Sequence, residues 1–324
     1  MSARRVHLLH GLEPDNLLAF LALLGALRAL AASDQPVQVR ASWSVDAPPL
    51  RPRLHVDGAV TEEVLLGRLA GGASNLAKVY AFGNRADLDY SLDECRAALL
   101  DAARNASVHD RARADLLSAV MHDASIKDGK EARIDATPLC LLFGQGHQHF
   151  LQRLAEVPTT VAPPPRGRGK AAVQISPAAC LAEALLSPWH RSDPTKSFRW
   201  DPSEDVRYAT MAGDPTDPAF KSGTQHGANR LAAFGLGALT VVSENRFGRA
   251  RPAIAGGARD RDGFSFAWPI WREPITLQAI VALLSHPALR QPGALTHLGV
   301  AHVMLARRVS VGKFMNFSRA RPIG

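Results

Sequence analysis

Two histidines in the segment GQGHQHF, His147 and His149, have the side chains best suited to metal binding or acid–base chemistry. A spacing of two would place both on one face of a strand. The Gly-x-Gly turn before them favours the start of a helix instead, where residues two apart point in different directions. No neighbouring acid or histidine completes a tetrahedral or facial ligand set. We therefore expect no metal and no cofactor, and we keep a metal-dependent nuclease that uses His147, His149 and a spatially distant acid as a rival hypothesis.

Motifs that position a nucleophile or a phosphate-binding loop are missing from the sequence. It contains no G-x-S-x-G elbow, no G-x-x-x-x-G-K-[ST] loop and no G-x-G-x-x-G segment that opens a helix after a strand. Paired acids such as Glu204 and Asp205 lie in proline-rich segments, where turns are expected. A two-metal nuclease needs acids fixed on rigid elements. We therefore predict no catalytic residues, no small-molecule substrate and a chain that is not an enzyme.

Positive charge is the strongest chemical signal in the sequence. The chain has 38 Lys and Arg against 30 Asp and Glu, a formal charge of +8 and a pI near 9.9. Arginine predominates, and its planar guanidinium binds phosphate through paired hydrogen bonds. The basic residues gather in segment 157–172, in a glycine-rich hairpin near residue 250 and in the stretch 302–322, with phenylalanines among them. Nucleic-acid phosphates are the partner that this pattern favours; the alternative is a solvated basic face over core phenylalanines.

The candidate contacts fall into three groups. The first would bind phosphates from the hairpin and the C-terminal stretch: Arg246, Arg249, Arg251, Arg307, Arg308 and Lys313. The second lies in a polar loop that would enter a groove: Lys127, Lys130 and Arg133. Asn229 and Arg230 would read base edges if the helix start that carries them is exposed. Phe314 or Phe317 would serve as a wedge between bases, with burial in the core as the alternative.

The elements that must position these residues alternate between short strands and helices. Strands are predicted at 5–10, within 37–57, at 240–245 and at 263–271, and helices at 17–32, at 60–71, as a pair within 91–122, at 176–187, at 226–239 and at 275–286. The apolar run 17–32 is shorter than a membrane span, and Arg28 interrupts it. We therefore expect no membrane segment. Ser91 and Glu94 have the spacing of a capping box.

We predict an α+β fold of two mixed lobes. The N-terminal lobe would cover 1–156, a Pro/Arg/Gly linker 157–172, and a basic C-terminal lobe 173–324. The three cysteines are far apart and form no C-x-x-C pair, and no signal peptide is evident. These features favour free thiols and a cytoplasmic location.

The opening VHLLHGLEPDNLLAFLALLGALRALA has the order of a strand, a Gly-x-x-Pro turn and a helix. It resembles the N-terminal signature of type I-G (formerly I-U) CRISPR-associated proteins. Further matches are TPLCLLFGQGHQHFL, SFRWDPSEDVRYA, HGANRLAAFGLGAL and FAWPIWREPITLQAIVALLSHPAL. The most similar group occurs as a separate subunit or as an extension of the system's helicase-nuclease.

The resemblance implies a large-subunit-like role in the Cascade surveillance complex. Such subunits lie at the crRNA 5′ end, read the PAM in duplex DNA, separate the strands and recruit the helicase-nuclease. The implied partners are crRNA, target DNA, other Cascade subunits and the helicase-nuclease. At 324 residues the chain is short for a large subunit. An adaptor that binds the helicase-nuclease without touching nucleic acid is the alternative.

Overall fold

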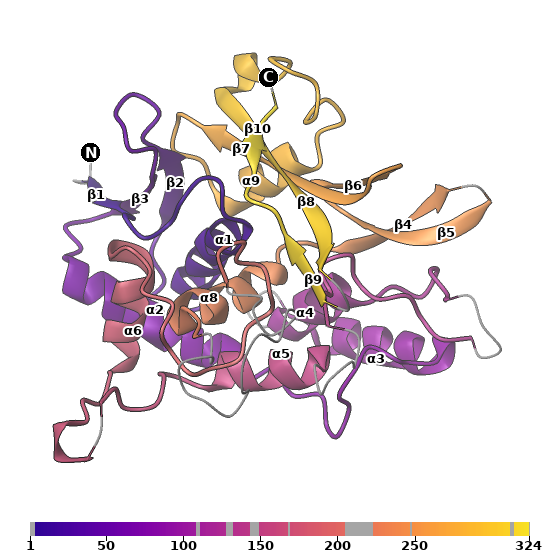
Figure 1. The fold of residues 1–324 in the computed structure, drawn as a ribbon, viewed down its shortest axis with the longest axis horizontal. Helices are drawn as coiled ribbons and strands as arrows, with labels where there is room; N and C mark the ends of the chain where they lie inside the picture. Colours follow the sequence, from indigo (N-terminus) through magenta and orange to yellow (C-terminus); the bar gives the residue numbers. More distant parts are fainter. Residues whose placement is uncertain are drawn as a thin grey trace.

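The computed structural model describes residues 4–107, 111–127, 132–142, 149–167, 169–204, 223–246, 248–311 and 314–323. Antiparallel strands and helices are both abundant, which confirms the predicted α+β class. Figure 1 shows a layer of helices with strands arranged above it. The helices are α1 Leu17–Ala31, α2 Glu62–Ala77, α3 Leu92–Asn105, α4 Ala112–Val120, α5 Phe150–Thr159, α6 Pro177–Leu186, α8 His226–Leu236 and α9 Leu277–Leu284.

Helix α1 is the centre of the helical layer. Asn16 caps it, because its side-chain oxygen accepts hydrogen bonds from the backbone N–H groups of Leu18 and Ala19 at 3.0 and 3.4 Å. From Leu17 to Leu30 every residue except Arg28 is buried, which explains why the run is apolar on all sides. Arg28 donates to Asp115 and to the Gly237 carbonyl oxygen.

Glycines let neighbouring helices approach α1 closely. A Cβ added at Gly25 would lie 1.8 Å from the Leu231 carbonyl oxygen of α8, so only a glycine lets α8 come this close to α1. A Cβ added at Gly72 of α2 would likewise lie 1.7 Å from the Ala29 carbonyl oxygen of α1. The predicted helix end at Gly71 and Gly72 is therefore wrong, since α2 continues to Ala77.

Within the described ranges the strands form three antiparallel groups. The first has the order β1-β3-β2, with β1 Arg4–Leu8, β2 Val39–Trp43 and β3 Pro52–Asp57. The second has the order β10-β8-β7-β6, and β9 pairs with β8. The third is the two-stranded hairpin β4–β5. Their bounds are β4 Val241–Arg246, β5 Arg249–Ile254, β6 Gly257–Asp260, β7 Gly263–Trp271, β8 Val300–Val311, β9 Phe314–Phe317 and β10 Arg321–Pro322.

The main hydrophobic core contains residues from both halves of the sequence. Phe20 of α1 stacks on Trp268 of β7 with ring centroids 5.5 Å apart, and α8 packs along α1.

The division of the chain into two lobes by a linker at 157–172 stays a prediction. Within that segment α5 runs through Pro158 to Thr159, and the backbone of Arg166 pairs with that of Val173. In the described part of the chain no helix combines the length and the apolar character needed to cross a membrane.

Candidate functional site

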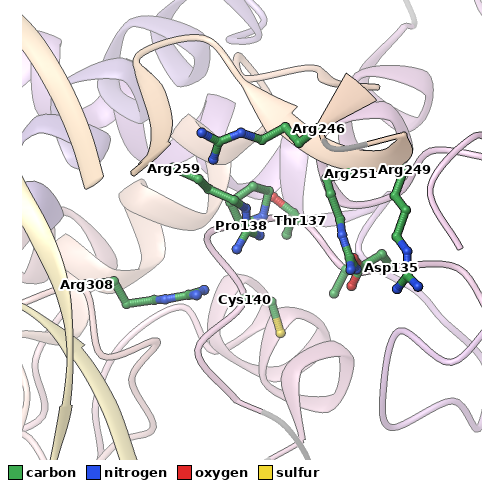
Figure 2. Close-up of a pocket in the computed structure, with 10 residues that line it drawn as sticks. Asp135, Thr137, Pro138, Cys140, Arg246, Arg249, Arg251, Arg259 and Arg308 are labelled. Atoms are coloured by element: carbon green, nitrogen blue, oxygen red, sulfur yellow. The ribbon is translucent and has the colours of Figure 1, made fainter. Parts of the chain in front are cut away.

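A cavity of about 520 Å³ lies where the β4–β5 hairpin meets the loop 132–142 and the edge of the second sheet (Figure 2). Among the described residues, five arginines and one acid line it, which is an excess of four positive charges. The lining residues are Asp135, Ala136, Thr137, Pro138, Cys140, Arg246, Arg249, Arg251, Arg259 and Arg308, and we call this cavity the arginine pocket.

The hairpin places three arginines on one of its faces. Arg246 and Arg249 are paired across the two strands, and paired residues share a face of an antiparallel sheet. Arg251 lies two residues beyond Arg249 and therefore points to the same side. Its guanidinium Nη1 is 3.4 Å from Asp135 Oδ2 of the loop. In Figure 2 Arg249 and Arg251 lie on the Asp135 side of the pocket.

Arg259 of β6 and Arg308 of β8 supply the wall that faces Cys140 (Figure 2). Both guanidinium carbons lie 5.7 Å from the ring centroid of Phe264, a distance at which the ring attracts a cation. Phe264 is only 2% exposed. It therefore supports the two arginines from behind and is not an exposed platform for a base.

Burial makes the positive charge of this wall costly. It lowers the pKa of Arg259, and the nearby Arg251 and Arg246 lower it further, while Asp135 opposes the shift. Burial likewise lowers the pKa of Arg308, and Arg259 adds to the effect. An anion in the pocket would relieve this mutual repulsion.

Apart from Asp135, the loop 132–142 contributes uncharged residues to the pocket. The Thr137 side chain is 2% exposed, and its hydroxyl has no hydrogen-bond partner among the residues that the structure describes. The Cys140 thiol donates to the Leu142 carbonyl oxygen at 3.2 Å. Burial raises the pKa of Cys140 to about 12, so the thiol stays protonated and is a poor nucleophile at neutral pH.

The structure brings together four of the predicted phosphate contacts: Arg246, Arg249, Arg251 and Arg308. Arg307 is next to Arg308 on β8 but pairs instead with Asp260 and Asp262, at 3.2 and 3.3 Å. Lys313 lies outside the described residues.

The polar loop is only partly described. Lys130 lies outside the described residues, and Lys127 is exposed. Arg133 donates to the Asp89 carbonyl oxygen at 2.8 Å and lies 4.0 Å from Glu94, so it is engaged within the fold. The backbone N–H of Lys127 donates to the Arg133 carbonyl oxygen, which closes the loop just before Asp135 enters the pocket.

The condition under which Asn229 and Arg230 would read bases is not met, because the start of α8 is buried. Asn229 is 1% exposed and accepts a hydrogen bond from the Phe198 N–H. Arg230 is 0% exposed, and its Nε donates to the Pro158 carbonyl oxygen at 2.9 Å. Small residues draw α8 against its neighbours and remove both side chains from solvent. Phe317 is also in the core, and nothing is described of the Phe314 side chain.

Sequence reasoning missed three pocket residues as site candidates: Asp135, Thr137 and Arg259. Arg259 was visible as one of the basic residues near the hairpin, and its pairing with Phe264 across β6 and β7 fixes the direction of its side chain. No local sequence pattern marks Asp135 and Thr137 as site residues, because their role depends on a hairpin more than a hundred residues later in the chain.

His149 does have an acidic partner that is distant in sequence. Its Nδ1 lies 2.7 Å from Asp87 Oδ2, and the other oxygen of Asp87 accepts from the Phe150 N–H at the start of α5. The pair borders an open hollow between α5 and the segment 83–86. His147 lies outside the described residues, and the described part of the chain holds no group of three or more side chains suited to a metal.

No family model, curated protein or solved structure matches this chain in comparisons of its sequence and structure.

Proposed function

We propose that this chain is a non-catalytic nucleic-acid-binding subunit of a type I CRISPR surveillance complex. It contacts crRNA and the PAM region of target DNA through phosphates and helps to recruit the helicase-nuclease. The arginine pocket carries the proposal, because the five arginines described in its lining come from four strands, β4, β5, β6 and β8, and meet one carboxylate. Arg-rich surfaces of this kind neutralise phosphates and release counterions. The resemblance of the sequence segments supplies the biological setting.

The test is a fluorescence-anisotropy titration against duplex DNA, single-stranded DNA and RNA at several salt concentrations. Wild type is expected to bind with a steep dependence of log K on log salt. Changing Arg246, Arg249 and Arg251 together to Ala should lower that slope by about 2–3. A matched variant with Arg104, Arg272 and Arg321 changed to Ala loses the same charge at exposed positions outside the pocket. It should keep most of the slope.

Two results would contradict the proposal. Equal slopes for the two triple variants would mean that the pocket is not the contact surface. Absence of binding at low salt would contradict nucleic-acid binding and favour the alternative, an adaptor for the helicase-nuclease. Neither triple variant would then weaken binding to the helicase-nuclease.

The contact between His149 and Asp87 is the observation that favours the nuclease alternative. An acid that holds one ring nitrogen of a histidine orients the other for proton transfer. Metal-dependent cleavage of DNA or RNA that is lost in His149→Ala would establish this activity. Under our proposal the wild-type chain cleaves neither, with or without divalent metal, and Asp87 serves to anchor the start of α5.

A further inference from the structure

The five arginines of the pocket are not equivalent. Arg246 is paired with Glu244 at 3.9 Å, and Arg251 with Asp135 at 3.4 Å. Arg259 and Arg308 have no ion pair with any residue in the described ranges, although both are largely withdrawn from solvent against Phe264. Buried charges are normally paired. These two arginines are therefore the part of the pocket that is incomplete without an anion.

A second observation points into the same cavity. Thr137 is one of the residues that line the pocket, and its hydroxyl is buried and lacks a hydrogen-bond partner within the part of the chain that is described. A buried hydroxyl without a partner costs about 1–3 kcal/mol relative to a satisfied one. The backbone groups of Thr137 already have partners: the N–H donates to the Val120 carbonyl oxygen, and the carbonyl oxygen accepts from the Cys140 N–H. The unused hydroxyl is free to donate to a ligand oxygen.

The chemistry of the ligand follows from these groups. Two guanidinium forks and one hydroxyl donor suit the several oxygens of a phosphate, and guanidinium binds phosphate through paired hydrogen bonds. A phosphate with a single ester bond carries about −1.5 to −2 charge at neutral pH, against about −1 for a backbone diester. The larger charge better offsets the excess of four positive charges in the lining. A monoester also presents three free oxygens to the cavity wall. A diester presents only two, and the nucleic-acid strand would have to enter and leave the cavity on either side of it.

We propose that Arg259, Arg308 and Thr137 form a site for a phosphate monoester, the terminal phosphate of a nucleic-acid strand. The inference rests on the proposed function, since it names the part of the nucleic acid that this pocket receives. The hairpin arginines then contact the adjacent backbone, and Phe264 holds the two inner arginines in place. The cavity volume of about 520 Å³ leaves room for the terminal nucleotide as well as its phosphate.

The test uses the full chain and three labelled single strands of one sequence, carrying a 5′ phosphate, a 3′ phosphate or hydroxyl groups at both ends. One of the phosphorylated strands should bind about tenfold more tightly than the hydroxyl strand, and which one identifies the end received. The adenosine monophosphate that carries its phosphate at the same position, 5′ or 3′, should compete with that strand, whereas adenosine should not.

Three variants locate the effect. Thr137→Val keeps the shape of the side chain and removes the hydroxyl, and Arg308→Lys keeps the charge and removes the fork. Each should abolish most of the preference for the phosphorylated strand over the hydroxyl strand. The control is Thr296→Val, at an exposed threonine outside the pocket whose hydroxyl donates to the Gly293 carbonyl oxygen. It should leave the preference intact.

Equal affinity for all three strands would overturn the inference and leave the proposed function standing, provided that the salt slope still responds to the hairpin arginines. A preference that survives in both Thr137→Val and Arg308→Lys would also overturn it, because the phosphate would then bind elsewhere. Should Thr137→Val fail to fold, Arg308→Lys decides between these outcomes. A preference that depends on Thr137 or Arg308, together with a salt slope unmoved by the hairpin arginines, would instead support this site and contradict the proposed backbone contact.

Discussion

His226 is a single residue whose protonation should control stability in acid. Its side chain is 0% exposed at the start of α8, and Nε2 lies 2.7 Å from the Thr160 carbonyl oxygen, which makes that nitrogen the donor. The other ring nitrogen has no partner among the described residues. Burial lowers the pKa of His226 below its ordinary 6.5, while the Thr160 contact and Asp193 oppose the shift and Arg230 adds to it.

The free energy of unfolding should therefore fall on acidification. A lowered histidine pKa means that the unfolded chain binds the proton first, so the stabilisation is complete above pH 6.5 and is lost as the pH falls toward the folded value. The slope from one such group reaches about 1.4 kcal/mol per pH unit. In His226→Gln the side-chain amide replaces the ring donor and does not titrate.

Urea unfolding of wild type and His226→Gln between about pH 7.5 and 5.5 measures this effect. Wild type should lose more stability than the variant over that range. His7 and His55, whose pKa values are also lowered by burial, are present in both proteins, so their contributions cancel in the difference. Parallel curves for the two proteins would show that His226 does not govern the acid response.

At the level of single residues, the sequence predicted part of the candidate site. Arginines of the hairpin and of the C-terminal stretch were predicted as phosphate contacts, and four of those side chains line one pocket. Alternation along a strand also predicts that Arg307 and Arg308 face opposite ways. It does not say which of them meets the pocket, because that depends on where the hairpin lies relative to β8. Thr137 was beyond prediction, since only the tertiary fold shows that its hydroxyl is left without a partner.

The contact between α1 and α8 decides how the helical layer is built. Gly25 of α1 and Gly235 of α8 face each other's backbone, and an added Cβ at Gly235 would come within 2.0 Å of the Leu21 carbonyl oxygen. The contact is backbone against backbone, so no flexible side chain can move aside. The two helices hold most of their buried surface against each other because these glycines permit the approach.

Gly25→Ala should therefore destabilise the protein by about 3 kcal/mol, since the helices must separate to admit the methyl group. Gly67→Ala in α2 is the matched control, because nothing lies within 4 Å of an added Cβ at that exposed helical position. It should stabilise by about 1 kcal/mol through helix propensity. The measurement is urea unfolding of both variants beside wild type. A neutral Gly25→Ala would show that the helix contact is loose.

Elements with strong local signals were predicted correctly. The capping box of Ser91 and Glu94 is present at the start of α3, the basic hairpin forms β4–β5, and the aromatic segment 263–271 forms β7. Local signals failed where tertiary packing decided the outcome. Gly72 has the pattern of a helix end, yet α2 continues through it because the missing side chain admits Ala29 of α1.

At the scale of the whole molecule, the pocket and the core are both built from distant parts of the sequence. The Arg251–Asp135 pair joins residues 116 positions apart, and the Trp268 indole donates to the Pro14 carbonyl oxygen across 254 positions. The arginine pocket therefore exists only when both halves of the chain are folded together. Composition and spacing predicted a basic surface, but the arrangement of that surface as a cavity follows from long-range packing.

Cutting the chain in its proline-rich segment should consequently leave the two parts associated. A protease site inserted between Pro164 and Pro165, both of which are exposed, should be cleaved without prior unfolding. Because α1 is buried against α8, the products should elute together on size exclusion and unfold in urea as one transition, at lower stability than the intact chain. Phosphate binding should survive cleavage for the same reason. Separation into two folded products, each with its own transition, would instead establish the two independent lobes that the linker pattern predicts.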